Sequence, residues 1–413
     1  MSNTQSPQHS VRCWLTLVAV ASTIASGWPL LGGEPDGRLV LMHYMPWYES
    51  ADVSGRWGGH WTGFDRSHDP DRRTPEGLPD IWSRFHPLIG PYDSADPALL
   101  DCHLAQLKLA GVDGLVVDWY GIAEAFDYPA IHKATTAAFE AAGRHGLSVA
   151  VCYEDRIVGL MTKGGMLPAD QAATRVAEDL RWLDDHWFGS PAYATLAGRP
   201  LLLNFGPITV TDAAAWQAAI KPLRHRPALF ALHHLWKKIG ADGGFTWIHW
   251  DPWEGEPDEP EIRRRLRRVF ALPSADPDEV IVSACPGYRD VYTDTRPELD
   301  HRAGDTLRVS LDEALASPAS VVQLVTWNDY GEGTMIEPTH EFGYRFLEIV
   351  QDANRRRLGE RLPFKADDLR LPARVYAARK AAAAPPADLD EVADLIRRGD
   401  CAKAEATLDR LKL

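Results

Sequence analysis

The chain has 413 residues, of which 45% are apolar and 25% are charged. This composition is typical of a globular protein with a large core, and it excludes a disordered chain and a polytopic membrane protein. The formal net charge is −14, and no basic run is longer than the short stretch Arg263–Arg265, so nucleic acid is not an expected partner.

The N-terminal residues 1–27 are predicted to be a signal peptide. An apolar run covers Cys13–Ala25, and Ala25-x-Gly27 fits a small-residue cleavage site. We therefore expect a secreted or periplasmic protein with no stable membrane partner. The alternative is an uncleaved anchor that continues to Leu31, although Pro29 interrupts it and the run is short for a membrane span.

The cysteines that follow the predicted signal peptide show no C-x-x-C pair and no zinc-ligand spacing. Export permits disulfides, but no pairing is predicted. We expect no metal ion and no organic cofactor. The four cysteines are Cys102, Cys152, Cys285 and Cys401.

Eight short apolar runs are predicted to be β-strands, and amphipathic helical segments separate most of them. This alternation predicts a parallel sheet covered by helices, and eight units match a (β/α)8 TIM barrel of the α/β class. An open doubly wound sheet is the alternative, but no G-x-G-x-x-G follows the first run and no P-loop occurs. The predicted strands are Leu39–Tyr44, Gly114–Asp118, Ser148–Tyr153, Pro200–Asn204, Ala228–His233, Phe245–Trp250, Val280–Cys285 and Val321–Trp327. The predicted helices are Ala98–Ala110, Pro129–Arg144, Asp170–His186, Asp212–Ile220, Glu259–Leu272, Ser310–Ala316 and Glu341–Arg356.

The predicted barrel occupies residues 38–360, and residues 361–413 are predicted to form a linker and a small C-terminal helical hairpin. The stretch Ala381–Ala387 reads AAAAPPA, and residues 388–411 carry apolar positions at helical spacing. Long insertions after the first and third strands, Glu49–Asp96 and Asp155–Leu167, lie at the end of the barrel where such folds place their sites.

Aromatic and acidic residues recur where the predicted strands end. Flat apolar rings and carboxylate acceptors suit a polyhydroxylated ligand, and the chain has 15 Trp against 12 Tyr and 12 Phe. The predicted substrate-binding residues among them are Trp47, Tyr153, Glu154, His234, His249, Trp250 and Asn328. The same strand ends also carry His43, Asp118, Tyr120, Asn204, His233 and Tyr288.

The stretch Thr326–Pro338, TWNDYGEGTMIEP, places two carboxylates three residues apart just beyond the last strand. Gly331 and Gly333 flank Glu332, so the backbone can turn sharply and present that side chain. Paired carboxyl groups are the minimal equipment for glycoside hydrolysis, and an apolar site would raise the pKa of one of them. The alternative is that Asp329 and Glu332 cap the next helix or pair with a nearby arginine, Arg345.

Four stretches together resemble glycoside hydrolase families 71 and 99. They are HYMPWY (43–48), the following His60-Trp61, DGLVVDWYG (113–121) and TWNDYGEGTMIEP (326–338). The resemblance implies a (β/α)8 barrel that cleaves α-linked oligosaccharides or polysaccharides. Family 99 enzymes are endo-α-mannosidases and family 71 enzymes are α-1,3-glucanases.

The resemblance also implies roles for particular residues. Glu332 matches the general acid/base, and Asp329 matches a glutamate that in family 99 is thought to deprotonate the sugar 2-hydroxyl to give an anhydro-sugar. Tyr44 and Trp119 resemble positions that line the sugar subsite. The start Asn-Asp-Tyr-Gly-Glu is like family 71, whereas Gly-Thr-x-Ile-Glu-Pro is like family 99, so the sugar and the stereochemistry stay open.

Two other functions and a metal site are alternatives to a glycoside hydrolase. The barrel could bind glycans without cleaving them, or act in polysaccharide biosynthesis. The pair His233-His234 and His249-x-Asp251 could reach one metal ion if their strand ends converge, although sugar binding or packing by single histidines is favoured. Asp155 is expected to form a salt bridge in its loop. Trp57, Trp61 and Trp82 could line outer subsites or anchor the first insertion.

Overall fold

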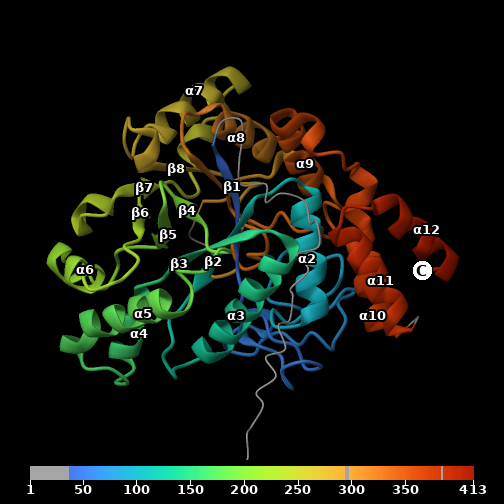
Figure 1. Cartoon of the computed structure of the whole chain (residues 1–413), viewed down its shortest axis with the longest axis horizontal. Helices are drawn as coiled ribbons and strands as arrows, with labels where there is room; N and C mark the ends of the chain where they lie inside the picture. The colour runs from blue at the N-terminus through green and yellow to red at the C-terminus, as the bar shows by residue number, and fades with distance from the viewer. Residues whose placement is uncertain (1–36, 294–296, 383–384) are drawn as a thin grey trace, which may run out of the picture.

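The protein is a closed barrel of eight parallel strands surrounded by helices (Figure 1). The computed structural model describes residues 37–293, 297–382 and 385–413. The strand order is β3-β2-β1-β9-β8-β7-β6-β5, and pairing between β3 and β5 closes the barrel. The barrel strands are β1 (Leu39–Tyr44), β2 (Gly114–Trp119), β3 (Ser148–Tyr153), β5 (Arg199–Asn204), β6 (Ala228–Leu232), β7 (Gly243–Phe245), β8 (Val280–Ala284) and β9 (Val321–Leu324). The two-residue strand β4 (Thr195–Leu196) pairs with β5 in antiparallel fashion.

Helices follow most of the strands and cover the outside of the barrel. The (β/α)8 prediction is therefore confirmed. After β6 there is only a 3-10 turn at Trp236–Ile239, because that connection is too short for a full helix. The helices are α1 (Gly59–Thr62), α2 (Pro97–Leu109), α3 (Tyr128–His145), α4 (Arg156–Lys163), α5 (Ala172–His186), α6 (Ala213–Ile220), α7 (Glu259–Phe270), α8 (Asp305–Ala316), α9 (Arg345–Leu358), α10 (Leu371–Lys380), α11 (Pro386–Arg397) and α12 (Cys401–Leu411).

Alternate residues of each strand face the barrel interior and the surrounding helices. On β1, Leu41 packs in the interior cluster, whereas Val40 and Met42 pack in the larger cluster shared with the helices. The same period of two holds on β3, where Cys152 belongs to the interior and Tyr153 to the outer layer. The alternation decides which strand-end side chains can reach the mouth of the barrel.

Strand β7 differs most from its predicted bounds, Phe245–Trp250. The strand is Gly243–Phe245, and it includes two glycines that weaken its apolar pattern. A Cβ atom at Gly243 would lie 2.5 Å from the carbonyl oxygen of Glu279, so the close approach of β8 requires glycine there. The aromatic stretch that suggested a strand instead forms the loop beyond it.

The C-terminal portion is helical and packs beside α2 (Figure 1). The predicted hairpin corresponds to α11 and α12, with Gly399 in a left-handed conformation between them. An additional helix, α10, precedes the Ala/Pro stretch Ala381–Ala387, and its Arg379 forms an ion pair with Asp101 of α2 at 3.0 Å. The predicted signal peptide lies outside the described residues. Within those residues, no helix is long and apolar enough to cross a membrane.

Candidate active site

A cavity of about 940 Å³ opens at the carboxyl ends of the barrel strands. Its wall combines carboxyl groups, aromatic rings and the first insertion. Five of the predicted site residues line it: Trp47, Glu154, Trp250, Asp329 and Glu332. Further lining residues used below are His43, Trp57, His60, Asp118, Tyr120, Asp127, Tyr128, Arg156, Tyr288 and Tyr292.

The loop that carries the two predicted catalytic carboxyl groups is fixed by its own hydrogen bonds. The backbone N–H of Glu332 donates to Oδ1 of Asp329 at 2.9 Å, and that of Asp329 donates to the hydroxyl of Thr326 at 2.8 Å. Gly333 has a φ of 67°, and a Cβ atom at Gly331 would lie 2.0 Å from the hydroxyl of Tyr292. The two glycines therefore allow the sharp turn that the sequence predicts.

Asp329 and Glu332 have different environments although they share one loop. Asp329 is 3% exposed, and burial raises the pKa of its carboxyl group to about 7, against the opposing effect of hydrogen bonds from the backbone of Glu332 and Gly331. Glu332 is partly exposed on the cavity wall. A pair of carboxyl groups in unequal surroundings is the arrangement that lets one act as acid and the other as base.

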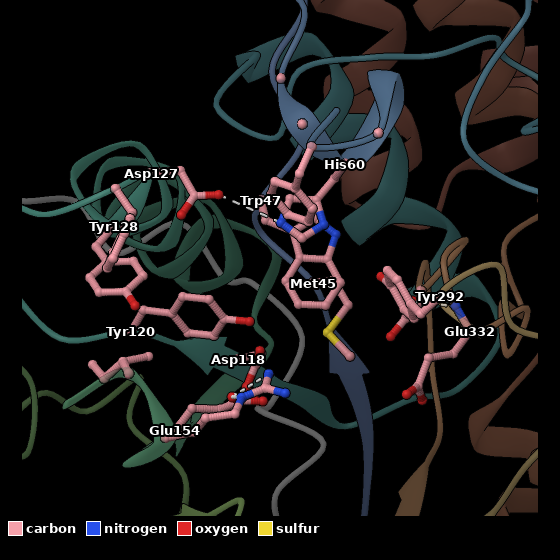
Figure 2. Close-up of a pocket in the computed structure, with 18 of the residues that line it drawn as sticks. Met45, Trp47, His60, Asp118, Tyr120, Asp127, Tyr128, Glu154, Tyr292 and Glu332 are labelled. Atoms are coloured by element: carbon pink, nitrogen blue, oxygen red, sulfur yellow. Dashed lines mark hydrogen bonds and ion pairs between the residues drawn. The ribbon is translucent and has the colours of Figure 1, made fainter. Parts of the chain in front are cut away.

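A second acidic group lies on the opposite side of the cavity. Figure 2 shows Asp118 and Glu154 across the open space from Glu332. Arg156 forms an ion pair with Glu154 at 2.8 Å. Burial raises the pKa of Glu154, an effect that Arg156 partly offsets, and burial together with Glu154 raises the pKa of Asp118 well above its ordinary value.

Aromatic side chains line the cavity beside these acidic groups (Figure 2). The ring of Trp47 stacks on His60, with centroids 4.4 Å apart and an interplanar angle of 8°. His60 lies 3.6 Å from the carboxylate of Asp127, which links the first insertion to the loop before α3. On that side the ring of Tyr120 packs edge-to-face on Tyr128. The result is a wide apolar wall with polar groups at its base.

Six predicted binding residues do not line the cavity, and three of them are aromatic residues at strand ends. Tyr44, Trp119 and Tyr153 end their strands one position after an inward-facing residue, so they point outward into the layer between barrel and helices. Their polar atoms bond there, to His103 at 3.1 Å, to His132 at 3.2 Å and to Asp179 at 2.8 Å, respectively.

Asn328, the fourth of these residues, is a buried support for the loops around the cavity. Its side chain accepts from the backbone N–H of Met45 at 2.8 Å and donates to the Met45 carbonyl at 3.0 Å. The hydroxyl of Tyr48 donates to the Asn328 carbonyl at 2.8 Å. Asn328 therefore joins the loop after β9 to the loop after β1, which positions Asp329 beside it.

The two predicted histidines also lie away from the cavity lining. His249 and His233 come together at the ends of β7 and β6, with ring centroids 5.2 Å apart, and His234 lies 5.0 Å from His233. Their strand ends do converge, as the metal interpretation required. These three rings do not form a group whose donor atoms all lie within 4.8 Å among the described residues.

Asp155 differs from its expected role as a salt-bridge partner. Its carboxylate accepts backbone N–H groups from Ile208, Thr209 and Val210 at 2.7–3.0 Å. Asp155 is completely buried, so it holds the loop after β5 in place rather than facing solvent. The reason is local: the loop offers three successive backbone N–H donors to this one carboxylate.

The three tryptophans of the first insertion were expected either to line outer subsites or to anchor the insertion, and the structure shows both kinds of placement. Trp57 lines the cavity. Trp61 is fully buried and donates to the carbonyl of Tyr92 at 2.8 Å, so it anchors the insertion. Trp82 makes edge-to-face ring contacts with Phe64 and Tyr292, two residues that line the cavity.

Several cavity residues were not among the predicted site residues. His43, Asp118, Tyr120 and Tyr288 stood at the strand ends in the sequence, and the alternation of β-strands could have selected His43 and Asp118 over Tyr44 and Trp119. Arg156 begins the short helix α4 and Tyr292 lies in a loop, and no periodic signal marks either of them.

The fold and the site thus define a (β/α)8 barrel with paired carboxyl groups and an aromatic wall at its functional end. No protein-family profile matches the chain. The chain is 24% identical over 331 residues to a glycoprotein endo-alpha-1,2-mannosidase-like protein of Danio rerio, covering 72% of this chain and 70% of that one. A human protein of the same description is 25% identical over 327 residues, covering 71% and 67%.

The solved structures with a similar fold include a family 99 enzyme. The GH99 endo-alpha-mannosidase from Bacteroides thetaiotaomicron superposes with a TM-score of 0.57 at 19% identity, covering 77% of this chain and 97% of that one. A structure described as a glycoside hydrolase-like protein gives a TM-score of 0.56 at 12% identity, covering 80% and 97%. Sequence and fold together confirm the resemblance to glycoside hydrolase family 99.

Proposed function

We propose that the chain is an exported glycoside hydrolase that cleaves α-linked glycans, with Glu332 as general acid/base and Asp329 as base. The observation that carries this proposal is the pair itself. Both carboxyl groups line one cavity at the carboxyl ends of the strands, and their surroundings differ. That placement and that inequality are what two-carboxylate hydrolysis requires.

The raised pKa of Asp329 supports its assignment as a base. A carboxylate with a pKa of about 7 binds a proton more strongly than an ordinary one, and general bases work best when their pKa lies near the operating pH. In the route that the resemblance implies, Asp329 takes the proton of the sugar 2-hydroxyl, whose oxygen attacks the anomeric carbon. Glu332 gives its proton to the departing glycosidic oxygen and later takes one from the water that attacks the anomeric carbon. Asp329 then returns its proton to the C2 oxygen as the C1–O2 bond of the anhydro-sugar breaks.

Unpaired polar atoms in the cavity wall support a polyhydroxylated ligand. The indole N–H groups of Trp57 and Trp250 and the hydroxyl of Tyr128 are buried and have no hydrogen-bond partner among the described residues. Buried donors almost always find a partner in a complete complex. Sugar hydroxyls would supply such partners while the sugar faces pack on the rings.

The names of the relatives narrow the substrate class within this proposal. Those compared above are described as glycoprotein endo-alpha-1,2-mannosidase-like proteins, so glycans that contain α-linked mannose are the first class to test. We would compare α-mannan with α-1,3-glucan and follow the first anomer released by NMR. If sugar is released from α-1,3-glucan but not from α-mannan, the substrate is a glucan and not a mannan.

The catalytic assignment is tested by Glu332→Gln, which keeps the size of the side chain and removes its proton. Turnover should fall by about 10²–10⁴-fold, the contribution of one positioned proton transfer. Glu360→Gln is the matched control, since Glu360 is exposed in a turn far along the chain from the site. Unchanged turnover in Glu332→Gln refutes the assignment. Saturable glycan binding with no product from the native protein would instead indicate a binding protein.

Export rests on the sequence of residues 1–27, with its apolar run and small-residue cleavage site. Expression in a host with a secretory pathway, followed by N-terminal sequencing of the material outside the cytoplasm, tests it. We expect a new N-terminus close to Gly27. A native Met1 on secreted or membrane-bound material would contradict cleavage.

A further inference from the structure

Three potential metal ligands come together on adjacent strands, two of them in the cavity lining and one behind it. They are His43 on β1, Asp118 on β2 and Cys152 on β3, and Asp118 and Cys152 are direct neighbours in the strand register. Among the described residues they form the one group of three whose donor atoms all lie within 4.8 Å of one another. We propose that these three side chains bind a divalent transition-metal ion of the zinc class.

The geometry is close to that of a bound ion. Zinc bonds to nitrogen, oxygen and sulfur of about 2.0–2.3 Å place tetrahedral donor atoms about 3.5 Å apart. The donor atoms therefore need to approach one another by up to about 1 Å when an ion binds. All three groups are buried, with 1%, 2% and 0% exposure for His43, Asp118 and Cys152.

The orientation of His43 leaves one ring nitrogen for a metal ion. Gln323 donates from its amide nitrogen to the hydroxyl of Ser283 at 3.3 Å, which turns its amide oxygen toward Nδ1 of His43, also at 3.3 Å. Nδ1 then carries the hydrogen and Nε2 keeps its lone pair. A histidine held in this way by an acceptor behind it is the usual arrangement for a metal ligand.

Asp118 provides the second, independent indication of a ligand. Its Oδ2 atom is buried and has no hydrogen-bond partner among the described residues. An unpaired buried carboxyl oxygen is costly unless something satisfies it. Asp118 also lines the cavity (Figure 2), so an ion in the cavity lies next to this residue.

The charges that face this site favour a cation. The acidic neighbours of Asp118 are Glu154, Asp329 and Glu332, whereas the basic neighbour is Arg156, whose guanidinium is paired with Glu154 at 2.8 Å. Three carboxyl groups around Asp118 therefore face one arginine that is already paired. The groups that face Asp118 are therefore mainly acidic, which suits a bound cation.

The donor set selects the kind of ion. One nitrogen, one oxygen and one sulfur atom suit zinc or cobalt, and the thiol disfavours magnesium and calcium, which prefer oxygen ligands. His43 and Asp118 line the cavity but Cys152 does not. The fourth coordination position therefore faces the cavity, where water or a sugar hydroxyl would occupy it.

The test uses the full chain and cobalt as a spectroscopic probe, without any glycan, so its outcome is independent of the proposed hydrolase activity. Metal-free protein is titrated with Co²⁺, and the thiolate-to-cobalt charge-transfer absorption is followed. We expect one equivalent to bind, Zn²⁺ to displace it, and one Zn²⁺ per chain to survive gel filtration. Absence of both stoichiometric binding and the charge-transfer band in the native protein overturns the proposal.

Variants then assign the ligands. Cys152→Ser should lose the charge-transfer band, while Cys285→Ser, a second buried cysteine on the same barrel, should keep it. Asp118→Asn should weaken Co²⁺ binding by at least about tenfold, since changes even behind the ligands have effects of that size. Thermal unfolding of each variant without metal verifies that it is folded. A band that persists in folded Cys152→Ser contradicts the assignment.

Discussion

The protonation of Asp329 gives the sharpest prediction about this site. Its buried carboxyl group has a pKa of about 7, compared with an ordinary value of 3.8. Because the folded chain holds this proton more tightly than the unfolded chain, stability is lost as the pH rises from about 4 through 7. The difference between the two pKa values corresponds to a loss of about 4 kcal/mol above pH 7.

Asp329→Asn removes the titration and keeps an oxygen that can accept from the backbone of Glu332. The variant should therefore equal the native protein in stability near pH 4 and exceed it by up to about 4 kcal/mol at pH 8. Urea unfolding at pH 4, 6 and 8 measures this difference. A difference between the two proteins that does not change with pH would refute the described environment of Asp329.

The same group predicts the pH dependence of activity. Asp329 must be ionised to act as a base, so kcat/KM of the native enzyme should rise with pH on an acidic limb centred near pH 7. Asp329→Asn should lose about 10²–10⁴-fold in turnover at pH 8, although it is the more stable protein there. An acidic limb centred below pH 5 would contradict the raised pKa. Equal turnover of the variant would remove Asp329 from the mechanism.

Two further substitutions test how the loops around the site are held. Gly331→Ala places a methyl group against the hydroxyl of Tyr292, which lies only 2.0 Å from the ideal Cβ position. The loop must therefore shift, and we expect a clear fall in kcat with a smaller change in the urea midpoint. Equal kcat and an unchanged urea midpoint would show that Tyr292 moves aside freely. Asp155→Ala leaves the backbone N–H groups of residues 208–210 without their acceptor and should cost about 3 kcal/mol or more in the free energy of unfolding, whereas Asp155→Asn, which keeps one acceptor oxygen, should cost clearly less. A loss that is the same in both variants would mean that the charge of Asp155, and not its hydrogen bonds, stabilises the loop.

Much of the fold could be predicted because its signals are local. The strands β1 and β3 have their predicted bounds, since each is a continuous apolar run between polar segments. The helix α2 begins after Asp96, which accepts from the backbone of Ala98, and stops before Gly111. The predicted bounds of strand β7 were wrong because the strand contains two glycines, which lack the apolar pattern that marks a strand.

The pair Asp329 and Glu332 could be predicted from the sequence because the two residues are only three positions apart on one loop. The glycines on either side of Glu332 let that loop turn, so both side chains reach the same cavity. Tyr44 and Trp119 were chosen by their position at a strand end, and only the direction of each strand in the closed barrel shows that they face outward.

The sequence by itself determined the barrel and the loop that carries Asp329 and Glu332, because both depend on periodicity and spacing over a few residues. Only the tertiary structure brought His43, Asp118 and Cys152 together, because their contact depends on the register of three parallel strands that are separated by whole helices. No spacing rule within one segment describes such a group. The physical reason is that strand pairing sets the distances between residues of different segments, whereas a sequence pattern sets the distances between residues of a single segment.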